Sequence, residues 1–290
     1  MNVLIAGGSG HIGRHLTDNL QKRGYRVSWL TRKKVRGVFS EQFVWSYAEN
    51  KFDLNALTDI DIVINLSGAP INGKRWTGSY KKEIYESRIL GTRFLIQKIN
   101  CIKNNIKLLI NGSAIGYYGY EYYEGAIDES FKSGKDFLAT TCMDWENETE
   151  LLDSNIRKVI VRTGVVFNEG SEAYYNIVKP IKLNVGSVIG SGKQYFNWIH
   201  IEDLVNLFIY CIEQTNCQGV YNAVAPVNMN ISEVTNIISS KLNKIIWLPN
   251  IPNWVVKLLI GELANSLLNG NKISVDKILN AKFNFKHTSL

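Results

Sequence analysis

The chain has 290 residues, of which 45% are hydrophobic and 20% are charged, with 23 glycines and only 5 prolines, which excludes collagen-like and low-complexity proteins. Its formal charge of +7 comes from scattered basic residues, so a pocket for a small anion is favoured over a nucleic-acid surface. The sequence has no run of about 18 apolar residues, so no transmembrane helix is predicted. It also has no basic leader, so no signal peptide is expected. Four dispersed cysteines without CxxC spacing argue against a zinc site and favour a reducing, cytoplasmic compartment.

The first half of the sequence alternates short apolar strands with helices. Residues 2–6 predict a buried strand, and a glycine turn at 7–10 leads into a helix that ends at Gly24. Further strands are predicted at 26–30, 61–66, 107–111 and 158–162, with helices at 79–103 and 136–153. This alternation indicates βαβ units and a doubly wound parallel sheet of the Rossmann type.

The second half is richer in helices. Helices are predicted at 172–183 and 201–214, a strand at 219–224, and further helices at 231–242, 254–268 and 274–281. We therefore predict a nucleotide-binding domain over 1–224, which includes part of a substrate loop at 170–200. An α-rich C-terminal substrate lobe is expected over 225–290.

The turn after the first strand reads GGSGHIG and satisfies GxGxxG with Gly8, Gly10 and Gly13. Small residues let the backbone approach a pyrophosphate, and the following helix offers free N–H groups to the anion. The strand–turn–helix context supports a dinucleotide site. The alternative is a glycine turn that serves only helix–strand packing.

The end of the second strand indicates which dinucleotide is bound. The sequence there is WLTRKK, without the acidic residue that would bind a ribose 2′-hydroxyl. Arg32, helped by Thr31 or Lys33, is suited to a 2′-phosphate, which predicts NADP(H). A solvated basic turn is the alternative. Small residues at 65–69, after the third strand, would let the cofactor cross the sheet edge.

The segments GGSGHIG, INLSGAPI, NGSAIGYYG, RTGVVF and GSGKQYFNWIHIEDL resemble the short-chain dehydrogenase/reductase superfamily. More narrowly, the chain is similar to extended, NAD-dependent epimerase/dehydratase-like "epimerase family" proteins, whose C-terminal segment of unknown function resembles residues 247–285. The resemblance implies a Rossmann domain that binds NADP(H) beneath a smaller lobe. The cofactor contacts it implies are Gly7, Ser9, Gly10, His11, Ile12, Gly13, Thr31, Arg32, Leu66, Ser67, Gly68, Glu83, Arg88 and Val166. Without this resemblance, Glu83 and Arg88 are equally well interpreted as an exposed pair on a helix.

Most members of the superfamily pair a serine with a YxxxK motif, in which the tyrosine exchanges a proton with substrate. Alignment places the tyrosine and lysine positions near Leu138 and Cys142, and neither has the required chemistry. The catalytic candidates are therefore Ser113, Tyr117 and Tyr118.

Other polar residues are weaker candidates for the site. His200 is either a catalytic group or the cap of the next helix, and Tyr120, Tyr122 and Tyr123 are lid candidates. A YxxxK spacing that ends at Lys179 lies beyond the fifth strand and is interpreted as coincidence.

The function favoured by the sequence is NADP(H)-dependent oxidoreductase or epimerase chemistry on a small carbonyl or nucleotide-linked sugar. The alternative is a dinucleotide-binding sensor or scaffold without turnover, a role that the cell-division-related names of some relatives would suit. We expect a small-molecule substrate, and no metal, nucleic-acid or membrane partner.

Overall fold

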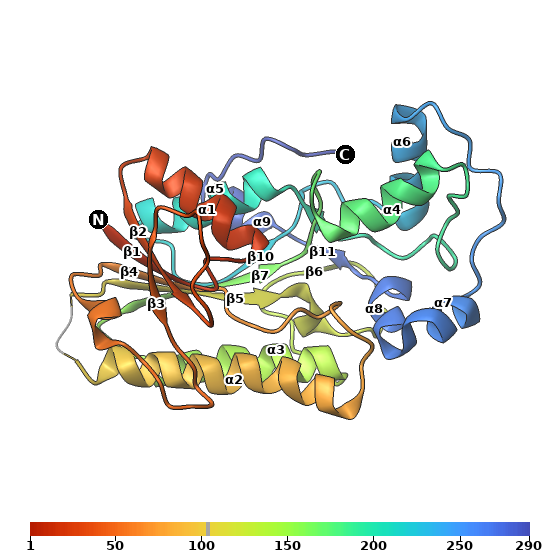
Figure 1. The fold of residues 1–290 in the computed structure, drawn as a ribbon. Helices are drawn as coiled ribbons and strands as arrows, with labels where there is room; N and C mark the ends of the chain where they lie inside the picture. Colours follow the sequence, from red (N-terminus) through yellow and green to blue (C-terminus); the bar gives the residue numbers. More distant parts are fainter. Residues whose placement is uncertain (103–104) are drawn as a thin grey trace.

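A parallel sheet with helices on both faces organises the protein (Figure 1). The computed structural model describes residues 1–102 and 105–290. Within that range the main sheet has the order β10-β7-β5-β4-β1-β2-β3, with parallel pairing throughout. Its strands are β1 (Asn2–Ala6), β2 (Arg26–Thr31), β3 (Glu41–Val44), β4 (Ile62–Asn65), β5 (Leu108–Ala114), β7 (Arg157–Thr163) and β10 (Gly219–Ala223). The predicted Rossmann-type fold is confirmed.

The sheet is buried on both faces, as the continuous apolar runs of its strands predict. In β1, Val3 and Ile5 pack on one side, where α1 (His11–Lys22) and α5 (Ile201–Glu213) lie. Leu4 and Ala6 point to the other side, which is covered by α2 (Gly78–Asn100) and α3 (Phe137–Glu148), as Figure 1 shows. Alternate residues of one strand therefore anchor both helical layers.

The sheet contains one strand that the sequence analysis missed. Residues Glu41–Val44 form β3, the edge strand paired with β2. Its sequence, EQFV, is half polar, and its residues are exposed or only partly buried, so it lacks the apolar run of a central strand.

Several predicted helices have different limits in the structure, among them the helix predicted at 136–153, which is α3 and ends at Glu148. The helix predicted at 79–103 is α2 (Gly78–Asn100), and its predicted end at Lys103 lies outside the described residues. The helix predicted at 254–268 is divided into α7 (Asn253–Ile260), a 3-10 turn (Gly261–Leu263) and α8 (Ala264–Leu268). Gly261 ends α7 because its φ of +66° is incompatible with a continuing helix.

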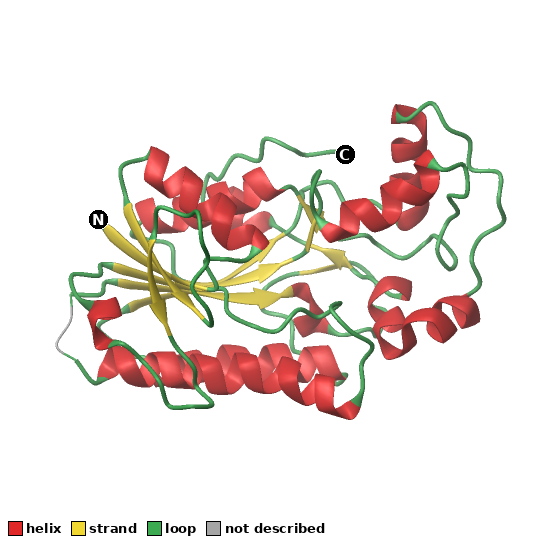
Figure 2. Cartoon of the chain, viewed as in Figure 1, coloured by secondary structure: helices red, strands yellow, loops and turns green. Residues whose placement is uncertain are grey.

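A smaller lobe lies beyond the carboxyl ends of the strands (Figure 2). It has its own apolar cluster, in which Phe167 and Trp198 pack against Val234 and Ile238. Its elements include β8 (Val165–Val166), α4 (Glu172–Lys182), β9 (Trp198–Ile199) and α6 (Ile231–Lys241). Segments from both sides of the predicted boundary at residue 224 contribute to this cluster, so the division into 1–224 and 225–290 stays a prediction.

The chain then returns to the main body. β11 (Lys272–Ile273) pairs with β6 (Ala126–Ile127), and α9 (Asp276–Asn280) follows it. The remaining 3-10 turns are Leu54–Leu57, Ile115–Tyr118 and Thr149–Leu151. No helix among the described residues has both the length and the apolarity that crossing a membrane requires.

Candidate functional site

The glycine turn between β1 and α1 is the tightest part of the site. Gly7 has a φ of +83°, and a Cβ there would lie 2.8 Å from the Leu66 carbonyl oxygen. A Cβ on Gly8 would meet the Trp29 ring at 2.3 Å, and one on Gly13 would meet the Gly7 oxygen at 2.6 Å. These three glycines are therefore needed for packing as well as for any ligand.

Gly10 differs from these glycines, because a Cβ there would meet only the Gly7 oxygen, at 3.3 Å. Gly10 is the N-cap of α1 and supplies no side-chain hydrogen bond to the helix. The first N–H groups of α1 therefore remain without a side-chain cap, which is the arrangement that binds an anion at a helix N-terminus.

A cavity of about 310 Å³ lies beside this turn, at the carboxyl ends of β1, β2 and β4. Eight residues expected to contact the cofactor line it together: Gly7, Ser9, Gly10, Arg32, Leu66, Ser67, Gly68 and Glu83. Arg32 is exposed, so its guanidinium is free to meet an incoming phosphate.

Two further expected contacts border the cavity without lining it. The Thr31 hydroxyl is buried and finds no hydrogen-bond partner among the described residues. Arg88 lies behind Gly68, where a Cβ would approach its Cζ at 2.9 Å. Its Nη1 donates to the carbonyl oxygens of Ala69 and Ile84, at 3.0 and 3.1 Å.

The charge of Arg88 has no carboxylate partner within the described part of the chain. Its guanidinium instead lies over the Trp145 ring, 5.2 Å from the centroid. Burial lowers the pKa of Arg88, because removing water disfavours the charged form. A half-buried cation without a counterion favours an anionic or strongly polar ligand nearby.

The other expected contacts lie around the turn. Ile12 packs on the core, Gly13 contacts the turn itself, and Val166 pairs with Ile199 between β8 and β9. The ring nitrogen Nε2 of His11 lies 3.1 Å from Oδ1 of Asn168, which links the glycine turn to the smaller lobe.

Among the residues of the cofactor cavity that were not predicted from the sequence, three are consecutive. Trp45, Ser46 and Tyr47 line it directly after β3. The available signal was the aromatic and β-branched residues of QFVWSY, which favour a strand that ends at the same sheet edge as Arg32. Since the strand itself was missed, its carboxyl end could not be placed.

A second cavity, of about 260 Å³, adjoins the first. Ala69 and Pro70 line the first cavity, and the next residue, Ile71, lines the second. The second cavity lies between the 3-10 turn after β5, helix α3 and the smaller lobe. Leu138 and Cys142, at the positions where the superfamily has tyrosine and lysine, line this cavity.

Cys142 does not replace the missing lysine. Burial raises the pKa of its thiol to about 12, so the group stays neutral near pH 7. It therefore contributes a small apolar surface rather than a charge.

The polar groups next to this cavity form one buried network. Ser113 Oγ donates to Glu146 Oε1 at 2.5 Å, and Glu146 accepts two bonds from Arg162, at 2.9 and 2.8 Å. Arg162 also donates to the Tyr118 hydroxyl at 3.0 Å, and that hydroxyl donates to Asn222 Oδ1 at 2.7 Å. Ser113 and Tyr118 were predicted from the sequence as candidates, whereas Glu146 and Arg162 were not. Arg162 within the apolar strand KVIVRT was the available signal, since a buried charge requires a partner.

The two candidate tyrosines have different surroundings. Tyr118 lines the second cavity, and burial raises its pKa to about 12, although Arg162 acts in the opposite direction. The centroid of the Tyr117 ring lies 3.4 Å from the Arg162 guanidinium carbon, in a cation–π contact. Tyr118 therefore keeps its proton and serves as a hydrogen-bond donor.

The remaining candidates are dispersed. His200 caps α5 by accepting from the Glu202 N–H at 3.3 Å, and burial together with the neighbouring His287 lowers its pKa. Tyr120 lines the second cavity with a buried hydroxyl that is unpaired among the described residues, whereas Tyr122 is exposed. The hydroxyl of Tyr175 accepts a hydrogen bond from Lys179 on the exposed side of α4, and neither residue lines the second cavity.

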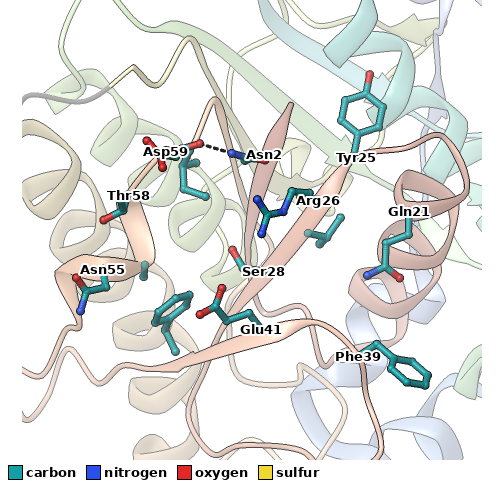
Figure 3. Close-up of a pocket in the computed structure, with 14 residues that line it drawn as sticks. Asn2, Gln21, Tyr25, Arg26, Ser28, Phe39, Glu41, Asn55, Thr58 and Asp59 are labelled. Carbon is teal, nitrogen blue, oxygen red and sulfur yellow. Dashed lines mark hydrogen bonds between the residues drawn. The ribbon is translucent and has the colours of Figure 1, made fainter.

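A larger hollow, of about 560 Å³, lies near the amino ends of β1 and β2 and beside β3 (Figure 3). Arg26, Ser28 and Glu41 point into it, and Asn2 is bonded to the Asp59 carbonyl at 2.7 Å. Ligands of open α/β sheets bind outside the carboxyl ends of the strands. We therefore assign the functional site to the opposite edge, where the glycine turn lies.

Comparison with known proteins agrees with this geometry. The NAD dependent epimerase/dehydratase family matches residues 3–223, and a domain of unknown function (DUF1731) matches residues 251–290. The chain belongs to the NAD dependent epimerase/dehydratase family.

Similar proteins occur in distant organisms. An epimerase family protein of Mycobacterium bovis is 34% identical over 99% of this chain and 94% of its own length. A chloroplastic SDR39U1 homologue of Arabidopsis thaliana is 32% identical over 99% of this chain and 84% of its own length. The crystal structure of the human epimerase family protein SDR39U1 with NADPH has a TM-score of 0.89 and 30% identity, covering 100% of this chain and 96% of that chain.

Proposed function

We propose that this family member is an NADP(H)-dependent oxidoreductase or epimerase that acts on a small carbonyl compound or a nucleotide-linked sugar. The observation that carries the proposal is the position of Arg32. It lines the cavity beside the glycine turn, and no acidic residue stands at the end of β2 to favour NAD. The NADPH in the human relative supports the same choice of cofactor.

The donor groups of the chain fit such a cofactor. The start of α1, which has no side-chain cap, would hold the pyrophosphate. Arg32 would hold a 2′-phosphate together with the Thr31 hydroxyl, which has no partner among the described residues. Ser67 and Gly68 would let the remainder cross the sheet edge toward Arg88. A bound nicotinamide would supply hydride transfer at the boundary between the two cavities.

The second cavity is the proposed substrate site. Its lining comes from the Rossmann domain and from residues 266–271 of the smaller lobe, so both parts would contact the substrate. Its volume suits a small carbonyl compound or the reacting half of a larger molecule. Tyr118 would donate its proton or a hydrogen bond to the substrate oxygen, with Arg162 supplying the positive charge that a YxxxK lysine would otherwise provide.

One observation favours a second function, dinucleotide binding without turnover. Ser113 is bonded to Glu146, and Tyr118 is bonded to both Asn222 and Arg162, so neither hydroxyl is free. A sensor or scaffold would keep the cofactor site and use this network only for stability. The suggested link to cell division and the cytoplasmic location stay predictions.

The two functions are separated by one assay on the purified protein. NADPH oxidation is followed at 340 nm against a panel of aldehydes, ketones and nucleotide sugars, and calorimetry measures NADPH binding separately. Turnover that falls in the Tyr118→Phe variant supports an enzyme. Tight NADPH binding with no turnover on any member of the panel supports the sensor, and absence of NADPH binding contradicts both.

A further inference from the structure

Two of the four histidines of the chain meet at the start of α5. His200 is the N-cap of this helix, and His287 lies in the C-terminal segment that follows α9. The centroids of their rings are 3.7 Å apart, and the rings are tilted by 34°. Nε2 of His287 also lies 2.9 Å from Oε2 of Glu202, in the first turn of α5. The fold therefore brings two imidazoles and one carboxylate together.

These three side chains are spaced as metal ligands can be. One ligand atom from each of His200, Glu202 and His287 lies within 4.8 Å of the other two. In a tetrahedral zinc site, bonds of about 2.0–2.1 Å hold the ligand atoms about 3.4 Å apart. The ligand atoms therefore need to move only slightly closer, which rotation of partly exposed side chains allows.

Asp203 places His287 in this cluster. The carboxylate of Asp203 is buried and accepts hydrogen bonds from the backbone N–H groups of Lys286 and His287, both at 2.8 Å. The C-terminal segment is thereby held on α5 at the residue that carries the imidazole. Metal sites depend on hydrogen bonds of this kind around their ligands, because these bonds keep the ligands in position.

The ligand atoms remain available to an ion. The hydrogen bond from the Glu202 N–H to Nδ1 of His200 is 3.3 Å long, outside the usual range of about 2.7–3.2 Å, so this imidazole is weakly engaged. Lys286 binds Oε1 of Glu202 and leaves Oε2 to the cluster. The side chains of His287 and Glu202 are 37% and 43% exposed, which gives an ion a path to the site.

A cavity of about 310 Å³ lies beside the cluster, between α4, α6 and the C-terminal segment. His200 and His287 both line it, so an ion held between them would have one position open to this space. Trp198 lines the same cavity, is 2% exposed, and has an Nε1 without a hydrogen-bond partner among the described residues. A water or small ligand beside the ion would supply the acceptor that this N–H lacks.

We propose that His200, Glu202 and His287 bind a Zn²⁺ ion, which fastens the C-terminal segment to the start of α5. Two nitrogens and one carboxylate oxygen favour Zn²⁺ over Mg²⁺ or Ca²⁺, which prefer oxygen ligands. The ion replaces the hydrogen between His287 and Glu202, and water takes the fourth position. The site lies outside the nucleotide and substrate cavities, since none of its three ligands lines either of them.

The sequence alone predicts no metal partner, because these ligands have no metal-binding spacing. His287 is 85 residues from Glu202, and only the docking of the C-terminal segment on α5 brings them together. An ion at this place would therefore bind the folded chain and not the unfolded one, and should raise its melting temperature.

The test titrates the full chain with Zn²⁺ by calorimetry, after treatment with a chelator and without a histidine-containing affinity tag. Co²⁺ is added in a parallel titration, because its visible absorption reports the coordination geometry. We expect one Zn²⁺ per chain and the intense absorption of four-coordinate Co²⁺. His287→Asn removes one ligand and should weaken Zn²⁺ more than about 100-fold, since losing a group that only orients a ligand already costs about 10–100-fold.

Two variants serve as controls for the loss of His287. Lys286→Ala should bind Zn²⁺ at least as tightly as wild-type protein, because Lys286 competes with the ion for Glu202. His15→Asn removes an imidazole of α1 that packs edge-on against His11 and does not belong to the cluster, so the Zn²⁺ affinity should stay unchanged. Circular dichroism of each metal-free variant checks that the fold is kept.

A measurement on wild-type protein makes the test independent of how the variants fold. The X-ray absorption spectrum of the zinc-loaded chain should show two histidine nitrogens at about 2.0–2.1 Å and no sulfur. The proposal is overturned if wild-type protein binds no Zn²⁺, or if its spectrum shows sulfur ligands or fewer than two imidazoles. It is also overturned if folded His287→Asn binds Zn²⁺ as tightly as wild-type protein, or if His15→Asn loses as much affinity as His287→Asn.

Discussion

Arg162 binds Glu146 through two parallel hydrogen bonds in the interior, where the exposed fractions of their side chains are 3% and 9%. The pair joins β7 to α3, and Ser113 of β5 completes the coordination of the carboxylate. Such a pair costs much desolvation, which its hydrogen bonds offset only while every member is present. The network is therefore sensitive to the loss of any one charge.

Glu146→Gln should destabilise the fold strongly, because it leaves the Arg162 charge buried without a counterion. Breaking a buried pair in this way costs about 3–5 kcal/mol, measured as the fall in unfolding free energy in urea. Glu150→Gln is the matched control, since the Glu150–Lys158 pair is on the surface and the Glu150 side chain is 71% exposed. That variant should lose less than about 1 kcal/mol. Equal losses of unfolding free energy in the two variants would show that the buried pair contributes no more to stability than the surface pair.

The tyrosine variants test proton transfer. If the protein turns over a carbonyl substrate, Tyr118→Phe should lower kcat by about 10²–10⁴-fold, the usual effect of losing a general acid or base. Tyr117→Phe should have a smaller effect, because its ring still faces Arg162. NADPH affinity should stay unchanged in both, since neither hydroxyl is assigned to the cofactor. If both variants retain full turnover on a verified substrate, the assignment fails and His200 is the next residue to test.

Substitutions at two glycines of the turn should have different effects, one on ligand binding and the other on folding. Gly10→Val should fold and lose NADPH binding, because its Cβ has one neighbour at 3.3 Å yet stands at the start of α1, where the pyrophosphate would lie. Gly13→Val should unfold at lower temperature, because its Cβ would lie 2.6 Å from the Gly7 oxygen. Circular dichroism and calorimetry on the two variants check both statements. A folded Gly10→Val protein with normal NADPH affinity would assign the turn to packing alone.

Acid should release the C-terminal segment from α5. The hydrogen bonds from His287 and Lys286 lower the pKa of Glu202 from about 4.5 to about 2. A lowered carboxyl pKa stabilises the fold above pH 4.5, and this contribution is lost as the pH falls from 4.5 toward 2. The melting temperature of wild-type protein should therefore fall faster over this window than that of Glu202→Gln, and the two curves should converge. Curves that remain parallel would contradict this role for Glu202.

The fold could be predicted largely because its central strands are buried on both faces and read as apolar runs. β3 was missed because an edge strand needs no such run, and its neighbours Trp45 and Tyr47 were missed with it. The apolar spacing over 254–268 predicts one continuous helix because it persists through Gly261, where the backbone turns.

The cofactor half of the site followed from local sequence, since the turn, the end of β2 and the end of β4 each contribute residues at a strand's carboxyl end. The catalytic half depends on partners that are distant in sequence. Ser113 and Glu146 are 33 residues apart, and Tyr118 and Arg162 are 44 apart. No periodicity connects such residues, so the buried network required the structure.

The most direct test of the account is the NADPH and NADH affinity of Arg32→Ala, measured by calorimetry beside wild-type protein and Lys34→Ala. Lys34→Ala removes the same charge from an exposed residue of the same segment that does not line the cavity. A hydrogen bond to a charged group contributes about 1.5–3 kcal/mol. Arg32→Ala should therefore weaken NADPH about tenfold or more and leave NADH nearly unchanged, with little effect of Lys34→Ala on either. Equal weakening of both cofactors by Arg32→Ala would contradict the assignment of Arg32 to the 2′-phosphate, and with it the NADP(H) preference.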